Sequence, residues 1–199
     1  CYLKYTQRHI EAVSNHLILY SEADYEAAQD KIALGTCILE AWIPSEKVVS
    51  LSVVRNERGE LLIYPPFEQV QSSAVSGTQV RYPVKLHEEV EREIRRLGRY
   101  LVETLALVGC MTIDFLVTSA GVVYINSVEI GAKDAAMFTL GAMSLSCYEA
   151  MVRSVVGLPL PSLVPLADAA IALPLEALNA EQVMTQYMLR TDWGFALFN

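Results

Sequence analysis

An apolar stripe with helical spacing runs through residues 86–108. Successive members lie 4, 4, 3, 4, 4 and 3 residues apart, namely Leu86, Val90, Ile94, Leu97, Leu101, Leu105 and Val108. This period, sustained over six turns, predicts one long amphipathic helix that ends at Gly109. A helix with one apolar side buries that side against the rest of the protein, so the stripe marks part of the core.

Apolar runs on both sides of short turn sequences predict two antiparallel hairpins. The runs and their turns are 48–54 and 60–64 around Asn56-Glu57-Arg58-Gly59, and 110–117 and 122–128 around Thr118-Ser119-Ala120-Gly121. With helices at 86–108 and 134–156, this pattern predicts an α+β fold, an antiparallel sheet with flanking helices. We expect both helices to pack on one face of the sheet.

Capping and breaker residues outline the other elements. Ser21 opens a Ser-Glu-Ala-Asp sequence that is typical of a capping box, so a helix is expected from there to Leu34, ending at Gly35. The remaining expectations are a short strand at 17–20, a buried strand at 36–43, a loop with at most one edge strand at 65–84, a helix at 134–156 that ends at Gly157, and a short helix near 176–190.

Composition limits the class of protein. The chain has 199 residues, of which 53% are hydrophobic and 19% charged, so it can bury a core as one domain or two small ones. A net charge of −8 gives no general attraction to nucleic acid or anionic membrane, and no apolar run is long enough to span a bilayer. Because the chain opens at Cys1 instead of Met, we expect an upstream segment to be missing. The compartment, expected to be intracellular, stays open between cytoplasm and mitochondrion.

The four cysteines are far apart in the sequence and share no Cys-x-x-Cys spacing. They are Cys1, Cys37, Cys110 and Cys147. A zinc site would need clustered ligands, and a free cysteine packs as a small apolar side chain. We therefore expect buried reduced thiols.

A charged residue interrupts the apolar run at 110–117. Asp114 lies between Ile113 and Phe115, and the next predicted strand contains Asn126, a second polar residue in an apolar run. A buried carboxylate needs hydrogen-bond partners or a metal ion. Two interpretations follow: a magnesium site that holds nucleotide phosphates, or a carboxylate that is hydrogen-bonded to a neighbouring strand or loop.

This constellation, followed by Val155-Val156-Gly157-Leu158-Pro159-Leu160, resembles the ATP-grasp fold. Within that fold it is similar to the 5-(carboxyamino)imidazole ribonucleotide synthetases of purine biosynthesis, which use ATP and bicarbonate to carboxylate aminoimidazole ribonucleotide. The matching stretches are Tyr2-Leu3-Lys4, Ile38-Leu39-Glu40, 49–55, Gly59-Glu60, Tyr64-Pro65, 109–114, Gly121, Asn126 and 153–160. The resemblance implies a remnant of the small lid subdomain at 1–45, the carboxyl-terminal ATP-grasp domain at 46–160 and an extension at 161–199, without the family's amino-terminal domain.

The resemblance also assigns roles to single residues. It implies that Lys4 contacts an ATP phosphate, that Glu40 lies beside the adenine, and that Asp114 and Glu129 are the available magnesium ligands. Arg55 and Lys133 are relic candidates for contacts in the catalytic cleft. The alternatives are an exposed strand-end lysine for Lys4 and a salt bridge to a nearby glutamate for Arg55.

Several positions depart from the family pattern. No glycine occurs between residues 1 and 34, so the phosphate-covering loop is replaced by Gln7 to Ser14. Ser127 stands where the family has a metal-binding glutamate, and Glu129 lies two residues further along the strand. In the substrate loop, Gly131 replaces an arginine, while Lys133 and Met137 replace histidines. The remaining departure is the turn Glu68-Gln69-Val70-Gln71, which has lost another histidine.

Three functional hypotheses follow. The first is a catalytically degenerate domain that serves as a structural or binding subunit of a larger assembly and needs no cofactor, with organellar ribosomes as the analogy. The second is an active but divergent ligase that uses ATP and magnesium through Lys4, Arg55, Asp114 and Glu129. The third is a module that senses nucleotide without turnover.

The expected partners are other protein subunits rather than a membrane. The segments expected to contact them are the tail from Trp193 to Phe198 and the loop at 131–138, where small and apolar residues replace polar ones. An RNA contact is not indicated by the net charge. The basic run on the 86–108 helix is expected to be a solvated face with helical ion pairs, the alternative being an RNA or protein contact. It comprises Arg92, Arg95, Arg96 and Arg99.

Overall fold

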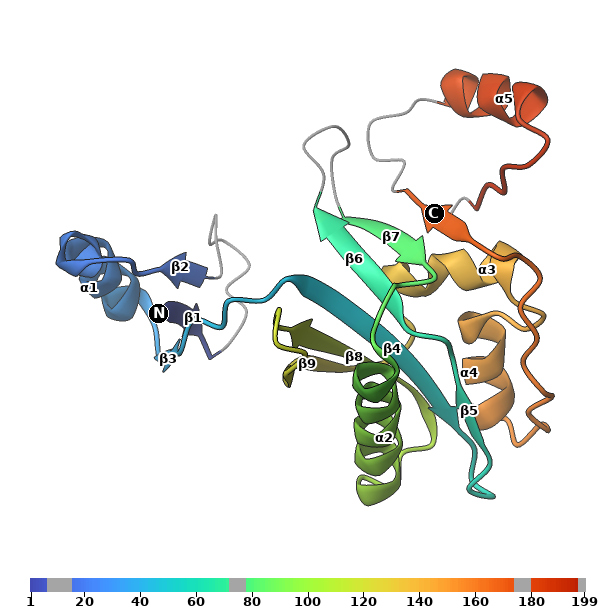
Figure 1. Ribbon diagram of the computed structural model, residues 1–199, viewed down its shortest axis with the longest axis horizontal. Helices are drawn as coiled ribbons and strands as arrows, with labels where there is room; N and C mark the ends of the chain where they lie inside the picture. Colours follow the sequence, from blue (N-terminus) through green and yellow to red (C-terminus); the bar gives the residue numbers. More distant parts are fainter. Residues whose placement is uncertain (7–15, 72–77, 174–179, 197–199) are drawn as a thin grey trace. The chain divides into compact units, whose positions relative to one another are not determined.

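The computed structural model describes residues 1–6, 16–71, 78–173 and 180–196. They form two compact units, Cys1–Pro44 and Ser45–Asn199 (Figure 1). No helix among the described residues is long and apolar enough to cross a membrane.

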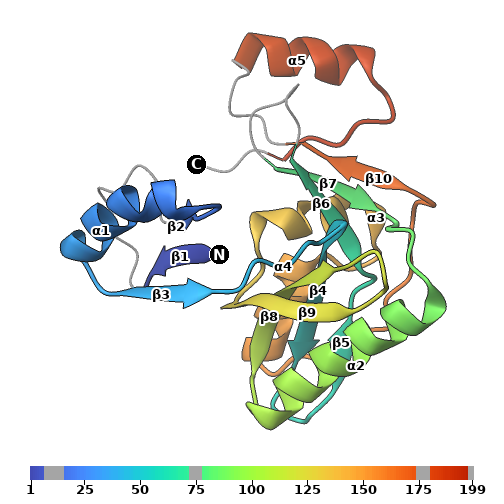
Figure 2. The ribbon, with the colours of Figure 1, turned by 60° about the vertical axis from the view of Figure 1, so that its left-hand side comes forward.

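The first unit is a three-stranded antiparallel sheet with one helix. Its elements are β1 (Tyr2–Tyr5), β2 (His16–Ile18), a 3-10 turn at Glu22–Asp24, α1 (Tyr25–Leu34) and β3 (Cys37–Glu40). Strand β1 lies between β2 and β3 (Figure 2). The capping box at Ser21 is confirmed, because its hydroxyl accepts a hydrogen bond from the backbone N–H of Ala23 and the Asp24 carboxylate accepts one from the backbone N–H of Ser21. The expectation of a buried strand at 36–43 is wrong, since Ile38 and Leu39 are 46% and 62% exposed.

The second unit is built on an antiparallel sheet, as predicted. Its strands follow the order β10-β7-β6-β4-β8-β9, and β5 pairs with part of β4. The strands are β4 (Lys47–Arg55), β5 (Leu61–Ile63), β6 (Phe67–Gln71), β7 (Thr78–Tyr82), β8 (Gly109–Val117), β9 (Val123–Ile130) and β10 (Ala170–Ala172). Both predicted hairpins are confirmed. The expectation of at most one strand at 65–84 is wrong, because β6 and β7 pair with each other and β6 also pairs with β4.

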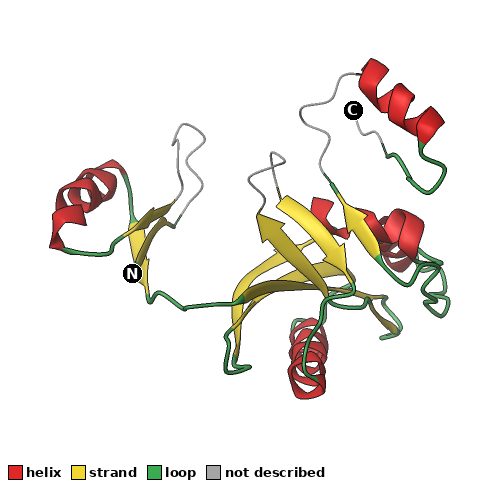
Figure 3. Cartoon of the chain, turned by 45° about the horizontal axis from the view of Figure 1, so that its top comes forward, coloured by secondary structure: helices red, strands yellow, loops and turns green. Residues whose placement is uncertain are grey.

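The helices of this unit lie on both faces of the sheet, so the expectation of one face is wrong (Figure 3). Helix α2 (Glu88–Thr104) packs on one face, whereas the 3-10 helix η2 (Asp134–Phe138), α3 (Thr139–Ala142) and α4 (Cys147–Val155) pack on the other. The reason is that β4 and β8 carry apolar side chains on both faces. Val49, Leu51 and Val53 are buried with α2, and Val54 is buried with α4.

Two helices differ from their predicted lengths. Helix α2 ends at Thr104, before the predicted Val108, because Ala106 adopts a positive φ of 47°. The predicted helix at 134–156 is interrupted, since Met143 is extended and bridges to Pro165. Helix α4 then begins again after Ser146, whose side chain accepts a hydrogen bond from the backbone N–H of Glu149.

The last helix is α5 (Ala180–Leu189), within the predicted 176–190. Rings of the following segment lie close to it, with the centroids of Tyr187 and Phe195 5.8 Å apart and those of Trp193 and Phe195 6.1 Å apart. The tail therefore folds back toward its own helix.

Candidate functional site

A row of buried polar side chains crosses the two central strands on the face that carries α4. Residues two apart on a strand point to the same face, and β4 and β8 pair so that Ser50 lies opposite Asp114 and Ser52 opposite Thr112. All four residues are buried. The hydroxyl groups of Ser52 and Thr112 lie 3.2 Å apart. The two strands thus place polar groups at the centre of the sheet, among buried apolar residues such as Val49, Leu51 and Ile113.

Asp114 is the centre of this row. Its Oδ1 accepts hydrogen bonds from the Ser50 hydroxyl at 2.6 Å and the Gln69 amide at 2.9 Å. Its Oδ2 accepts from the Ser127 hydroxyl at 2.8 Å and the Lys133 ammonium at 2.7 Å. An ionised carboxylate offers about four lone-pair sites, so the four donors use its accepting capacity.

A β-bulge decides which residue of β9 reaches Asp114. The register shifts between Asp114 and Phe115, so that Asp114 pairs with Ser127 while Phe115 pairs with Ile125. Asn126 is the extra residue of the bulge and is exposed. The prediction that Asp114 and Asn126 lie on adjacent strands is confirmed, but Ser127 is the residue that binds the carboxylate.

Lys133 lies between two carboxylates. Its Nζ is 2.7 Å from Oδ2 of Asp114 and 2.8 Å from Oε1 of Glu129. Burial alone would lower the pKa of this ammonium, but hydrogen bonds to Asp114 and Glu129 outweigh that effect and raise the pKa above its ordinary value. Lys133 is therefore held in its charged form.

Hydrogen bonds from α4 and β8 hold the backbone around Lys133 in place. The Tyr148 hydroxyl of α4 donates to the carbonyl of Lys133 at 2.9 Å. The Thr112 hydroxyl donates to the carbonyl of Gly131 at 3.1 Å, and the N–H of Gly131 donates to the carbonyl of Cys110 at 2.7 Å. Burial, followed by the charge of Asp134, raises the pKa of Tyr148 to about 12, so the phenol stays protonated and can donate.

The other predicted site residues do not join this network. Lys4 and Glu40 form an ion pair with each other across β1 and β3 of the first unit. Arg55 donates to the carbonyl of Leu107 at 3.0 Å, at the far end of β4. It lies five residues from Ser50 along the strand, roughly 17 Å away. The replaced phosphate loop, Gln7 to Ser14, falls outside the described residues.

Sequence reasoning missed three members of the site. Ser50 binds Asp114, Tyr148 holds the backbone of Lys133, and Gln69 was noted only as part of a turn that had lost a histidine. The sequence feature that could have indicated Ser50 is the pair of serines at alternate positions in the apolar run Val-Val-Ser-Leu-Ser-Val-Val. A polar side chain in a buried strand requires a partner on a neighbouring strand.

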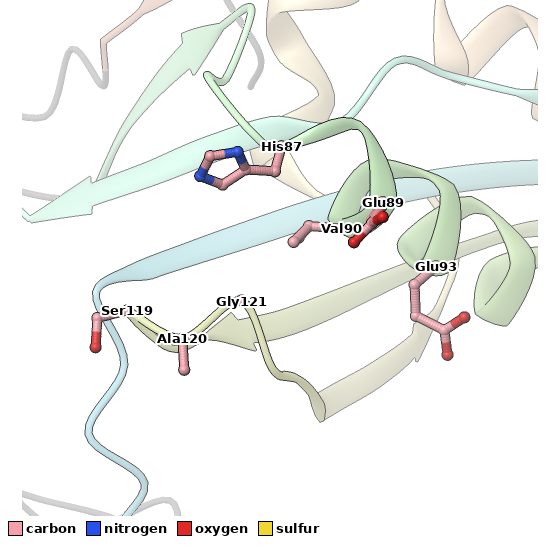
Figure 4. Close-up of a pocket in the computed structure, with 7 residues that line it drawn as sticks. All are labelled: His87, Glu89, Val90, Glu93, Ser119, Ala120 and Gly121. Carbon is pink, nitrogen blue, oxygen red and sulfur yellow. The ribbon is translucent and has the colours of Figure 1, made fainter.

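A pocket elsewhere on this unit is separate from the network. It lies between the start of α2 and the turn of the β8–β9 hairpin, as Figure 4 shows, and none of the residues around Asp114 line it. Its lining residues are His87, Glu89, Val90, Glu93, Ser119, Ala120 and Gly121.

The sequence that forms this site matches a known protein family. The family model described as the ATP-grasp domain matches residues 15–148, a stretch that includes Asp114, Lys133 and all the residues that bind them. This chain belongs to the ATP-grasp family. The predicted resemblance and fold class are therefore confirmed.

Two named relatives are similar to this chain over about two thirds of its length or more. The chain is 27% identical to the N5-carboxyaminoimidazole ribonucleotide synthase of Bacillus subtilis over 143 residues, which are 72% of this chain and 37% of the relative. It is also 27% identical over 133 residues to a formate-dependent phosphoribosylglycinamide formyltransferase of Synechococcus, covering 67% of this chain and 33% of that protein.

Solved structures of N5-carboxyaminoimidazole ribonucleotide synthetases have a similar fold. An N5-carboxyaminoimidazole ribonucleotide synthetase in complex with ADP superposes with a TM-score of 0.84 at 26% identity, over 94% of this chain and 49% of that one. The synthetase of Thermotoga maritima gives a TM-score of 0.72 at 26% identity, over 85% and 42%. The chain thus spans less than half the length of these structures.

ATP-grasp enzymes use ATP and magnesium, but the carboxylates of this ATP-grasp domain do not fit a magnesium ion. Mg²⁺ requires oxygen ligands in near-octahedral geometry, whereas Asp114 and Glu129 are bridged by the ammonium of Lys133. The remaining accepting sites of Asp114 are filled by side chains. Among the residues that the structure describes, no cluster of three or more His, Cys, Asp or Glu side chains is placed to hold a metal.

Proposed function

We propose that this ATP-grasp domain is non-catalytic and serves as a structural or binding subunit of a larger assembly. The observation that carries the proposal is the ammonium of Lys133 between Asp114 and Glu129. A cation supplied by the chain itself neutralises the carboxylates that would otherwise attract a divalent ion. Binding of magnesium would have to displace the partly buried, hydrogen-bonded ion pair of Lys133 with Asp114, which is unfavourable.

The departures from the family pattern support this proposal because they converge on one carboxylate. Gln69, Ser127 and Lys133 come from three different departures, and each donates a hydrogen bond to Asp114. The changes in the metal pair and in the substrate loop are therefore not independent losses. Together they form a satisfied polar network, which stabilises the sheet without a ligand.

The proposed contact surface for other subunits is α5 with the tail that follows it. The 131–138 segment is a weaker candidate than its sequence indicates, because Ala136 and Phe138 are buried in the core of their own unit. In contrast, α5 and the tail leave large apolar side chains exposed, which is typical of a contact site. They are Met184, Tyr187, Met188, Leu189 and Trp193.

The melting temperature, measured with and without millimolar Mg-ATP, tests whether the domain has lost nucleotide binding. A ligand at one hundred times its Kd would raise the melting temperature of a domain this size by roughly 5–10 °C. We expect no rise. A rise that disappears in Asp114→Ala would contradict the proposal and favour the active ligase or the nucleotide sensor.

Hydrogen exchange tests the proposed contact surface. We expect amides of α5 and residues 190–196 to exchange more slowly in the native context of the protein than in the isolated chain. Equal exchange in both would remove the support for an assembly role. The amides of α2, whose exposed face carries its own ion pairs, serve as the internal control.

A further inference from the structure

Two cysteines that are 37 positions apart in the sequence meet in the core. The Sγ atoms of Cys110 and Cys147 lie 3.4 Å apart, and the two residues are 1% and 0% exposed. Both are free thiols. The expectation of buried reduced thiols thus holds for this pair, whereas Cys1 is exposed and Cys37 is partly buried.

The surrounding structure fixes both thiols in place. Cys110 is the second residue of β8 and pairs with Val54 of β4. Cys147 is the first residue of α4, and its backbone N–H donates to the Thr139 hydroxyl at 3.0 Å. The Tyr64 hydroxyl donates to the carbonyl of Leu145 at 3.0 Å, which holds the segment before α4 against the sheet. The short sulfur–sulfur distance is therefore a product of the fold.

We propose that Cys110 and Cys147 are a redox-active pair that forms a reversible disulfide with hydrogen peroxide as the oxidant. The Cys147 thiolate attacks peroxide, gives a sulfenic acid and releases hydroxide. The Cys110 sulfur then displaces hydroxide from that sulfenic acid, so that one S–S bond forms. In total, two thiols lose two protons and two electrons, and peroxide is reduced to two water molecules.

The position of Cys147 favours it as the attacking sulfur. It begins a helix, where backbone N–H groups stabilise a thiolate. The hydrogen bond from the Cys110 thiol also lowers the pKa of Cys147, although burial opposes that effect. The same pairing raises the pKa of Cys110, which suits the thiol that reacts second.

The disulfide would close a loop around the network of Asp114. Asp114, Glu129 and Lys133 all lie between the two cysteines in the sequence, and Tyr148 follows directly after the second. Oxidation would therefore tie the start of β8 to the start of α4 and restrict the unfolded chain across this segment. A cross-link of this loop length is expected to raise the melting temperature by roughly 8–15 °C.

The test uses the full chain with Cys1→Ser and Cys37→Ser, which leaves the buried pair as its two thiols. After treatment with peroxide, free thiols are alkylated in denaturant, and the intact mass, the linked peptides and the melting temperature are measured. We expect loss of two hydrogen atoms per chain, a peptide that links Cys110 to Cys147, and a higher melting temperature that dithiothreitol reverses. Addition of Cys147→Ala to this background is expected to abolish all three.

The linked peptide is decisive even if the Cys147→Ala variant does not fold, because it is measured with both cysteines present. Full alkylation of both thiols at a peroxide dose that oxidises Cys1 of the unmodified chain would overturn the proposal. So would overoxidation of a single cysteine without a link, or a link that leaves the melting temperature unchanged or lower.

Discussion

Among single residues, Asp114 has the largest role in the site. Its carboxylate joins β8 to β4, β6 and β9 and to the segment before η2, through Ser50, Gln69, Ser127 and Lys133. A buried carboxylate without these donors would be strongly unfavourable. The network therefore stabilises the arrangement of the strands at the position where the sequence predicted a magnesium site.

Replacement of Lys133 tests how much the chain depends on its internal cation. Lys133→Met keeps much of the side-chain length and leaves Asp114 and Glu129 without their cation. We expect the free energy of unfolding, measured by urea denaturation, to fall by roughly 2–3 kcal/mol, at or below the lower end for a fully buried ion pair because this one is partly buried. The control is Arg92→Met, which breaks the exposed pair with Glu88 and should cost less than about 0.5 kcal/mol. Equal effects would contradict the account.

Alkaline pH should weaken the same contact. The pKa of Lys133 is raised in the folded protein, so its stabilising effect is complete below its unfolded pKa of about 10.4 and is lost as pH rises through the folded pKa. The pKa of Tyr148, raised to about 12, acts in the same direction. We expect the melting temperature to fall above about pH 10, and more gently in Lys133→Met. An equal slope in both proteins would show that Lys133 does not contribute.

Among the elements, α2 packs closely against the sheet at one glycine. Gly98 lies on its buried side, where a Cβ atom would be 2.4 Å from Cδ2 of Leu51 and 3.2 Å from Cγ2 of Val53. The four predicted ion-pairing arginines, by contrast, all bind glutamates on the exposed side. The helix thus has one face that packs on β4 and an opposite, exposed face that carries ion pairs. The ion pairs on the exposed face were predicted from the sequence.

Gly98→Ala tests that close contact. Although alanine favours a helix over glycine, we expect the added methyl group to overpack the buried Leu51 and to lower the free energy of unfolding by about 1–2 kcal/mol. Gly141→Ala in α3 is the matched control, because nothing lies within 4 Å of its added Cβ. It should be neutral or stabilising, and a Gly98→Ala protein as stable as that control would contradict the packing.

The sequence predicted elements whose pattern is local and missed those that depend on distant contacts. The helical stripe, the capping box at Ser21 and the two hairpins carry their signal within one segment, and the structure confirms them. Strands β6 and β7 contain many polar residues and are stabilised by pairing with β4 and with each other, which no local pattern reveals. The contact of Lys133 with Asp114 likewise depends on the bulge in β9 and on Tyr148.

At the scale of the whole molecule, stability is concentrated in the second unit. Both buried apolar clusters consist of residues after Pro44, one on each face of the sheet. The network of Asp114 also lies entirely within this unit. The first unit has its own small sheet, in which Lys4 pairs with Glu40.

Deletion of residues 1–44 tests this division. Because the deletion removes neither cluster, we expect the fragment 45–199 to unfold in one cooperative transition within a few degrees of the main transition of the full chain. Calorimetry measures both. A fragment without a cooperative transition would show that the second unit depends on the first.

We propose that Lys133 takes the place of a divalent ion, so that the domain does not bind Mg-ATP. Isothermal titration calorimetry of Mg-ATP into the full chain, at millimolar ligand concentrations, tests this proposal most directly. We expect only heat of dilution, both for the natural chain and for Asp114→Ala. Saturable binding of Mg-ATP to the natural chain, lost in Asp114→Ala, would contradict it.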